Sequence, residues 1–455
     1  MKSCKVFVPY GALGIGITKE AFDRGIELRP DIICCDAGST DSGPYFLGTG
    51  KGKYAREAVK EDLRLMMMGG KKLSIPIAIG TAGTCGVDGS VDELEEICLE
   101  ICREENLHVK IAKIYTEQKV EVLKKKFNEN KIIPLEAAPE ITAEVFGQCS
   151  HIVALAGAEP FIAALEAGVD VVLCGRATDT AIMAAMPLMK GCNTALAWHG
   201  AKIAECGPLC TTNPTGGGVF LTFDEDSFTI EPTGDDSQCT IYSVSAHMLY
   251  ENADPYRLKE PSGTLDTTSS TYIQVDDRKV KVTGSKFEHA QKYTLKLEGS
   301  APVGFQTISM VGIQDKRIME NPMVWINNLS HDVSMKLEKL GLPKDDFSFA
   351  LKPYGWNAVS EGAVREGYTP NEIGVLLVVN ATTQELATKV AKVFNPMLLH
   401  FPVDSNEQLP TFAFPFSPAE IERGQVYEFK LNHVVEVDDP LELIQIEYVD
   451  SRTKV

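Results

Sequence analysis

Short apolar runs alternate with amphipathic stretches from residue 5 to about residue 190. Runs that are apolar at nearly every position are typical of parallel strands buried on both faces, and the amphipathic stretches between them are typical of crossover helices. The pattern therefore predicts an α/β fold whose first domain is a mostly parallel sheet. The apolar runs read KVFVPY, DIICCD, IPIAIG, HVKIAKIY, HIVALA and VDVVLCG. The strands expected side by side, with their following loops on one edge, lie near residues 5–9, 31–35, 75–79, 151–155 and 170–174.

One of the crossover helices is expected in the segment SVDELEEICLEICREE, residues 90–105. Leucine, isoleucine and cysteine recur there at helical spacing. Ser90 followed by Glu93 matches a capping box, which satisfies the first backbone N–H groups of a helix. We therefore expect the helix to begin at Ser90.

The pattern changes at about residue 200, where the runs VFLTF, FTIEP, YIQVDD, KVKVTG and YTLKLEG are separated by prolines, glycines and Asp-Asp turns. Such runs are typical of antiparallel strands. From residue 371, a strand, a long helix, a proline-rich link and two further strands follow, an order that suits a ferredoxin-like α+β unit. We expect three domains, namely an α/β parallel-sheet domain with a ligand rim at 1–195, a β-rich domain at 196–370 and a ferredoxin-like domain at 371–455.

Composition narrows the class of protein. Of the 455 residues, 44% are hydrophobic and 24% are charged, which is ordinary for a folded globular chain. The net charge of -19 repels phosphate backbones and leaves no basic stripe, so we expect no nucleic-acid partner. The first apolar run is too short for a signal peptide or a membrane span, so we expect a cytoplasmic protein with no membrane partner. The twelve cysteines are expected to be reduced.

Five unusual loops follow the predicted strands. Their sequences are GALGIG, DAGSTDSGP, GTAGTCG, AGAEP and GRATD. In parallel α/β sheets, ligands bind outside the carboxyl ends of the strands, where such loops meet. Glycine lets the backbone approach a ligand and point N–H groups at an anion, although it also serves in ordinary tight turns. The loop residues expected to bind substrate are Gly38, Ser39, Thr40, Asp41, Thr81, Gly83 and Thr84.

Charged side chains on the same rim suggest the chemistry. Arg176 is expected to clamp a carboxylate or phosphate group, because its planar guanidinium matches such anions. Asp36, Glu159 and Asp179 are expected to be catalytic, since a carboxyl group whose pKa is raised by burial can take up or deliver a proton near neutral pH. Simpler interpretations stay open: Asp36 caps a turn, Asp41 lies in a solvated turn and Asp179 is an ordinary first residue of a helix.

The chain does not complete the known sequence motifs for binding a dinucleotide or a phosphate. Lys19 takes the place of the third glycine of a dinucleotide fingerprint, and Gly52 follows Lys51 where a phosphate loop requires Ser or Thr. The segment WHGAKIAECGPLC contains His199, Glu205, Cys206 and Cys210 without the paired spacing of a structural zinc site. We therefore expect no cofactor and no metal.

The order of these segments resembles the acyclic terpene utilisation (AtuA) family over almost the whole chain. The resemblance is carried by DAGSTDSGP, GTAG, AGAEP, GRATD, ECGPLC before PTGGG, YENADPYRLKEPSGTLDT and LPTFAFPFSPAEIERGQVYEFKLNHVVEV. It implies a ferredoxin-like carboxyl-terminal domain, a place in terpene degradation through acyl-CoA intermediates, and in some cases a small partner subunit.

Three functions from different classes are compatible with these features. The first is a cofactor-independent lyase or hydratase acting on an anionic carboxylic acid or its acyl-CoA thioester. The second is a CoA- or phosphate-binding transferase or ligase. The third is a non-catalytic subunit of a complex. A charged rim favours the first two, and the missing phosphate-loop pair favours the first. Exposed strand edges also lead us to expect a homo-oligomer.

Overall fold

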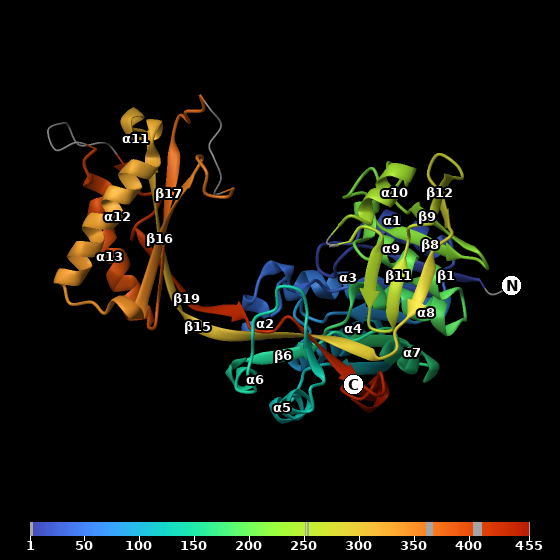
Figure 1. The fold of residues 1–455 in the computed structure, drawn as a ribbon. Helices are drawn as coiled ribbons and strands as arrows, with labels where there is room; N and C mark the ends of the chain where they lie inside the picture. The colour runs from blue at the N-terminus through green and yellow to red at the C-terminus, as the bar shows by residue number, and fades with distance from the viewer. Residues whose placement is uncertain (1–2, 251, 253, 361–366, 404–411, 455) are drawn as a thin grey trace. The chain divides into compact units, whose positions relative to one another are not determined.

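The computed structural model describes residues 3–250, 252, 254–360, 367–403 and 412–454. The chain forms two compact units, one made of Met1–Ala301 with Phe429–Val455 and the other of Pro302–Glu428 (Figure 1). Residues 404–411 of the expected proline-rich link lie outside the described residues, as do residues 251 and 253 of the segment YENADPYRLKEPSGTLDT.

A parallel sheet forms the centre of the larger unit. Its strands are β1 (Cys4–Val8), β2 (Ile32–Asp36), β3 (Ile77–Gly80), β7 (Val171–Cys174) and β4 (Lys110–Tyr115). They lie side by side in this order, and every neighbouring pair is parallel. The expected parallel arrangement is confirmed for four of the five strands named from the sequence, since these coincide with β1, β2, β3 and β7.

The fifth expected strand belongs elsewhere. Residues 151–155 form β6 (His151–Ala154), which pairs antiparallel with β15 (Tyr293–Ile313) rather than joining the parallel sheet. The prediction was wrong for this strand because an apolar run shows that a strand is buried but does not show which strand it pairs with. The position beside β7 is taken by β4.

Antiparallel strands extend the parallel sheet at both edges, giving ten strands in all. On one side the sheet continues from β1 through β8, β9 and β13 to β12, and on the other side β21 pairs with β4. These strands are β8 (Val219–Phe223), β9 (Ser227–Pro232), β12 (Thr271–Gln274), β13 (Val280–Thr283) and β21 (Gln445–Asp450). Much of the expected β-rich region thus continues the first domain's sheet.

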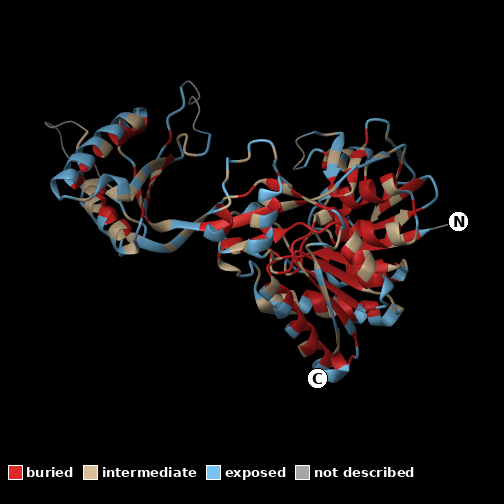
Figure 2. Ribbon diagram, turned by 60° about the horizontal axis from the view of Figure 1, so that its bottom comes forward, coloured by how far each residue is buried: buried red, intermediate tan, exposed pale blue. Residues whose placement is uncertain are grey.

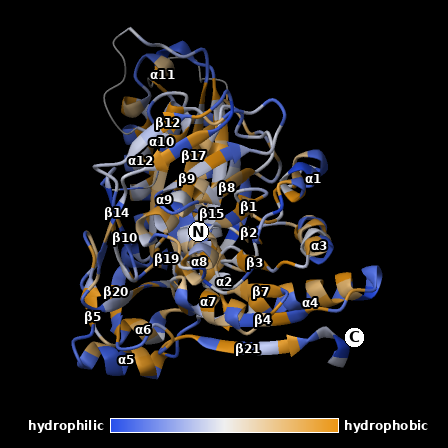
Figure 3. Cartoon of the chain, turned by 90° about the vertical axis from the view of Figure 1, so that its right-hand side faces the viewer, coloured by the Kyte–Doolittle hydropathy of each residue, from blue (hydrophilic) through white to orange (hydrophobic). Residues whose placement is uncertain are grey.

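Helices cover both faces of the parallel sheet (Figure 3). One face carries α1 (Lys19–Glu27), α3 (Arg56–Leu73) and α4 (Asp88–Glu105), and the other carries α7 (Glu159–Glu166), α8 (Asp179–Met189) and α9 (Thr194–Ala204). Along β2, Ile33 and Cys35 belong to the first core, whereas Ile32 and Cys34 belong to the second. Strands buried on both faces are therefore apolar at every position, and the buried residues concentrate on this sheet (Figure 2).

The helix expected at residues 90–105 is confirmed, but its start is different. Helix α4 begins at Asp88, its N-cap residue Val87 makes no side-chain hydrogen bond, and Oε2 of Glu117 accepts a hydrogen bond from the backbone N–H of Asp88 at 3.1 Å. Ser90 is buried inside the helix, so the predicted capping box does not form. The signal was misleading because Ser90 packs below the loop after β3, where Gly83 leaves room for it.

The remaining elements of the larger unit surround this sheet. The helices are α2 (Tyr45–Thr49), α5 (Val120–Asn128), α6 (Val145–Gln148) and α10 (Ile241–His247), with 3-10 turns η1 (Thr40–Ser42), η2 (Gly207–Cys210) and η4 (Ser451–Thr453). A small three-stranded sheet consists of β10 (Arg257–Glu260), β11 (Gly263–Asp266) and β14 (Lys286–His289). The first part of β15 pairs with β6 and with β20 (His433–Val437), which also pairs with β5 (Ile132–Pro134).

The smaller unit has a core of its own, built from helices on strands. Its elements are α11 (Lys316–Glu320), α12 (Pro322–Lys339), η3 (Lys344–Asp346), β16 (Phe347–Tyr354), β17 (Ile373–Ala381), α13 (Gln384–His400), β18 (Phe412–Ala413) and β19 (Glu420–Phe429). The second part of β15 pairs with β17, so this long strand contributes to both units.

The last two strands of the chain belong to a different unit from the strand and helix at residues 373–400. β20 and β21 lie in the larger unit, so the expected strand-helix-strand-strand unit at 371–455 is divided between the two compact units. The three-domain division at 1–195, 196–370 and 371–455 stays a prediction. All twelve cysteines lie in the described residues and carry free thiols, as expected. Among the described residues, no helix is both long and apolar enough to cross a membrane.

Candidate functional site

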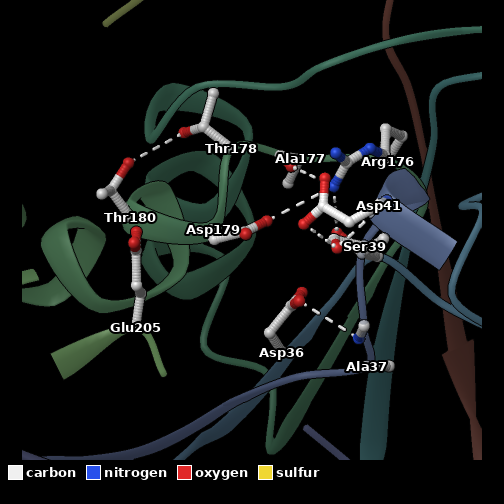
Figure 4. Close-up of polar contacts among 12 residues, drawn as sticks. Asp36, Ala37, Ser39, Asp41, Arg176, Ala177, Thr178, Asp179, Thr180 and Glu205 are labelled. Carbon is white, nitrogen blue, oxygen red and sulfur yellow. Dashed lines mark hydrogen bonds and ion pairs between the residues drawn. The ribbon is translucent and has the colours of Figure 1, made fainter. Parts of the chain in front are cut away.

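The carboxyl ends of β2, β3 and β7 bring three of the expected loops together. Each loop follows its strand directly, so Asp36, Thr81 and Arg176 lie at the same edge of the sheet. Figure 4 shows Asp36 and Arg176 there. Backbone bonds tie the loops to one another, since Ala37 N–H donates to the Gly80 carbonyl and Thr81 N–H donates to the Gly175 carbonyl, both at 2.9 Å. The pairing of these strands in the sheet therefore fixes where the three loops lie.

Asp36 is the last residue of β2, and it is buried with 4% of its surface exposed. Its Oδ2 accepts a hydrogen bond of 3.1 Å from the backbone N–H of Gly38. Gly38 has φ +112, a conformation that favours glycine, so this turn requires its residue type. Among the described residues, Oδ1 of Asp36 has no hydrogen-bond partner. Asp36 thus caps the turn with one oxygen, while the hydroxyl of the neighbouring Thr81 acts on the same carboxyl.

Burial raises the pKa of Asp36 well above its usual range, and the charge of Asp179 adds to the effect, while Arg176 and hydrogen bonds with Thr81 and the Gly38 N–H oppose it. Burial also raises the pKa of Asp179, again against the charge of Arg176. Each carboxyl makes ionisation of the other more costly, so the two acids share the site as an interacting pair.

Arg176 is held in place on several sides. Its Nε donates to Oε2 of Glu298 at 3.0 Å, and its Nη1 lies 3.2 Å from Oγ1 of Thr81 and 3.3 Å from Oδ1 of Asp179. Burial acts against the charge of the guanidinium, but the carboxylates of Glu298 and Asp179 raise its pKa further, so it stays charged. Gly86 is required beside it, because a Cβ there would lie 2.1 Å from the backbone N of Arg176.

The loop after β3 carries an unusual backbone. Thr81 and Thr84 have φ +48 and +79, which β-branched residues rarely adopt. Such strained residues cluster at functional sites, where the surrounding structure holds them. The hydroxyl of Thr84 donates to the Ala37 carbonyl at 3.3 Å, so this loop braces the loop of Asp36. The sequence analysis named both threonines as substrate-binding loop residues, but a sequence pattern does not show backbone strain.

The loop after β2 is partly self-contained. Ser39 Oγ donates to Oδ2 of Asp41 at 2.7 Å and accepts from the Asp41 N–H at 3.3 Å. Asp41 is exposed, yet its charge acts on Asp179. Thr40 reaches Glu298, where it helps to lower the pKa of that carboxyl. The structure therefore places all three residues at the rim, with Ser39 and Asp41 forming the cap of a short turn.

Glu159 lies near the rim although the strand before it, β6, is not part of the parallel sheet. It begins α7, and its Oε2 accepts a hydrogen bond from the hydroxyl of Tyr293. The segment before α7 lies beside Arg176 because Ala156 and Ala177 form a parallel bridge. Glu159 thus sits on the flank of the site, bonded to Tyr293 rather than to Arg176 or Asp36.

In one of the five loops, the backbone N–H groups already bond a side chain of the protein. Asp62 of α3 accepts backbone N–H groups of Gly14, Gly16 and Ile17 in the segment GALGIG, at 2.8, 3.1 and 2.7 Å. Three N–H groups converging on one anion make a small anion-binding loop. Because a carboxylate of the chain occupies it, this loop is structural.

Sequence reasoning missed a second group of buried charges beside Asp179. Burial raises the pKa of Glu260 to about 7 and that of Glu205 to about 8. Lys202 pairs with Glu205, and the hydroxyl of Thr180 donates to Oε1 of Glu260 at 2.8 Å. The sequence analysis considered Glu205 only as a metal ligand and assigned the range that contains Glu260 to a β-rich domain. Long-range pairing alone brings them together.

A small pocket of about 110 Å³ adjoins the rim. Its lining includes Ala37, Gly83 and Thr84 from the loops after β2 and β3, with Lys53 and Arg56 on another side. Glu93 also lines the pocket and Arg56 pairs with Glu100 at 2.7 Å, so Lys53 is the cation best placed to meet an anionic group. His199, by contrast, is a satisfied core residue, since its two ring nitrogens bond the hydroxyls of Ser285 and Tyr272 at 2.7 and 3.1 Å.

Comparison with known proteins gives one match. The family model described as "Acyclic terpene utilisation family protein AtuA" matches residues 51–411, which is most of the chain. No curated protein and no solved structure matches the chain. The matched range includes the loop after β3, Arg176 and the buried charges beside it, while the loop of Asp36 precedes it.

Proposed function

Because the chain belongs to the acyclic terpene utilisation family AtuA, we propose that it is a lyase or hydratase acting on an anionic carboxylic acid or its acyl-CoA thioester. The family's name ties its members to acyclic terpene utilisation, which is a catabolic role. The reaction class is supported by one observation above all: Asp36 places a buried carboxyl oxygen without a hydrogen-bond partner among the described residues at the end of β2.

The two interacting acids would divide the work of adding or removing water. Asp179 accepts a hydrogen bond from Arg176 and so keeps its charge more readily, which makes it the base that takes the proton from the substrate's α-carbon. Asp36, whose pKa is raised further, is the acid that delivers a proton to the departing β-hydroxyl. The Cα–H and Cβ–O bonds break, a double bond forms and water leaves. Hydration is the reverse.

Arg176 would stabilise the negative charge that develops on the substrate's carbonyl oxygen. Glu298 and Thr81 hold the guanidinium in a fixed position, so little reorganisation is needed during the reaction. Lys53, in the neighbouring pocket, is placed to attract the anionic end of the substrate. Glu159 with Tyr293 is a further candidate for a proton donor on the flank of the site.

The assay uses a panel of branched 3-hydroxyacyl-CoA thioesters and the corresponding free acids in deuterated water. Formation of the unsaturated product reports elimination, and deuterium uptake at the α-carbon reports proton removal. Asp36→Asn should slow elimination by about 10²- to 10⁴-fold, the range typical of a positioned acid, while α-exchange continues. Asp179→Asn should suppress both.

Asp31→Asn is the matched control, because Asp31 lies just before the opposite end of β2 and pairs with Lys190 at 2.6 Å. It should leave both rates unchanged. If Asp36→Asn lowers thermal stability but leaves turnover per folded molecule intact, Asp36 is only a turn cap. If no compound of the panel shows exchange or elimination, the proposed reaction class is wrong, and a CoA- or phosphate-binding transferase or a non-catalytic subunit takes its place.

A further inference from the structure

Three side chains that can bind a metal converge beside the candidate site. Glu205 follows α9, Cys206 comes next in the chain and His247 ends α10. A carboxylate oxygen of Glu205, Sγ of Cys206 and a ring nitrogen of His247 all lie within 4.8 Å of one another. Two of the three residues belong to the segment WHGAKIAECGPLC, whose spacing alone did not indicate a site. The missing ligand comes from α10, 41 positions after Cys206 by their numbers.

His247 has a buried ring nitrogen that a bound ligand could satisfy. Only 6% of its surface is exposed, and its Nε2 is buried without a hydrogen-bond partner among the described residues. An unsatisfied polar atom in the interior is costly, so such atoms usually have a bonding partner. The ring stacks on Tyr250, with 5.6 Å between centroids and 18° between planes, so its orientation is fixed. A cation between His247, Cys206 and Glu205 would supply the partner.

Lys202 and two further carboxyls lie near Glu205. Lys202 pairs with Oε1 of Glu205, which leaves the second carboxylate oxygen to reach a metal. The carboxyls of Asp179 and Glu260 lie close enough for their charges to act on Glu205.

We propose that Glu205, Cys206 and His247 form a binding site for a divalent transition-metal ion of the zinc class. One sulfur, one nitrogen and one oxygen ligand suit zinc or cobalt, whereas magnesium and calcium prefer oxygen ligands alone. Three protein ligands leave a fourth position for water or substrate, as in catalytic zinc sites. The proposal revises the sequence-based expectation that the chain holds no metal, and it does not depend on the lyase reaction.

Metal binding by the full chain tests the site directly. The purified protein is stripped with a chelator and titrated with Co²⁺ and Zn²⁺, measuring stoichiometry by calorimetry and thiolate coordination by the charge-transfer absorption of bound Co²⁺. We expect one ion per chain with that absorption band. Cys206→Ser should remove the band. His247→Gln should weaken binding at least about tenfold, because even the outer partners of metal ligands change affinity by about 10- to 100-fold.

Matched controls separate this site from adventitious binding to the other thiols. Cys149→Ser changes another half-buried cysteine, which lies beside Gly299 and Leu431 and outside the cluster, and it should keep both the band and the affinity. Circular dichroism of each stripped variant shows whether it folds. If the wild type binds less than one ion per chain, or if Cys149→Ser and Cys206→Ser lose binding equally, the site is excluded. If Cys206→Ser does not fold, His247→Gln decides alone: unchanged affinity overturns the proposal.

Discussion

At the scale of single residues, the candidate site is a group of buried acids held around two buried cations. Asp36, Asp179, Glu205, Glu260 and Glu298 face Arg176 and Lys202. More carboxyls than cations in a dry environment make full ionisation costly, so the pKa values of several acids rise. Glu298 is the exception: burial acts to raise its pKa, but Arg176, Lys296 and Thr40 together lower it.

Arg176→Lys should weaken both binding and stability. An ammonium cannot reproduce the planar fork that joins Glu298, Thr81 and Asp179. Leaving Glu298 poorly paired in the interior should cost about 3 kcal/mol or more, and the apparent binding constant for substrate should rise. Denaturant unfolding and substrate titration measure the two effects. Arg452→Lys, in an exposed pair with Asp450, should change neither. Equal stability of the two variants would contradict this role for Arg176.

Glu260 should make stability depend on pH. Its pKa is about 7 in the folded protein, above the 4.5 of an ordinary glutamate, so the folded form binds the proton more tightly. The proton on Glu260 therefore stabilises the folded form. Its contribution to the free energy of unfolding is complete below pH 4.5 and is lost as pH rises through 7, a change of about 3 kcal/mol. Unfolding of the larger unit at pH 5 and pH 8 should therefore differ less in Glu260→Gln than in the wild type, by about that amount. The exposed Glu121→Gln should follow the wild type, and so would Glu260→Gln if the prediction is wrong.

At the scale of elements, the ends of the parallel sheet depend on strands from distant parts of the chain. β21 covers the outer edge of β4 over its whole length, with Asp450 opposite Lys110 and Gln445 opposite Tyr115. An uncovered edge of this kind presents unpaired N–H and C=O groups that can pair with another chain. The carboxyl-terminal strand thus protects the sheet that carries the site.

Removing residues 445–455 should therefore destabilise the larger unit and promote association. The uncovered β4 edge offers a template for pairing between molecules. Light scattering should therefore show larger particles, and the melting temperature of the larger unit should fall. A shorter truncation of residues 453–455 keeps β21 and is the control. A long truncation that stays as monodisperse and as stable as the wild type would show that β21 contributes little to the sheet.

At the scale of the whole molecule, the chain has separate cores in its two compact units. Each core is built from its own helices and strands, so the units need not unfold together. The homo-oligomer expected from exposed strand edges stays a prediction, and light scattering of the intact chain tests it against the monomer mass of 49.7 kDa.

Two truncations of buried rings should separate the unfolding of the units. Phe7 lies in the core of the larger unit and Phe394 in that of the smaller one, and both side chains are completely buried. Changing either to alanine should destabilise its unit by about 3–5 kcal/mol. Calorimetry should show two transitions, with Phe7→Ala lowering one and Phe394→Ala lowering the other. A single transition that both changes lower would mean that the chain unfolds as one cooperative unit.

The amino-acid sequence by itself determined the parallel sheet and the edge that carries the site. Strands apolar on both faces show in a local pattern, and the loops after β2, β3 and β7 then meet because parallel strands end together. Asp36, Thr81, Arg176 and Asp179 could be named on that basis. The free thiols of the cysteines and the helix α4 were also evident from local composition.

Only the tertiary structure decided which distant segments complete the site. Glu298 is 122 positions from Arg176, Glu260 is 80 positions from Thr180, and β6 pairs with β15 rather than with the parallel strands. Such pairings leave no local signal, because a buried strand looks the same beside any neighbour. The strained φ angles of Thr81 and Thr84 and the meeting of His247 with Cys206 follow from the same long-range packing. A pattern along the chain can identify the edge where chemistry is expected, but the full set of charges around it depends on contacts between segments far apart in sequence.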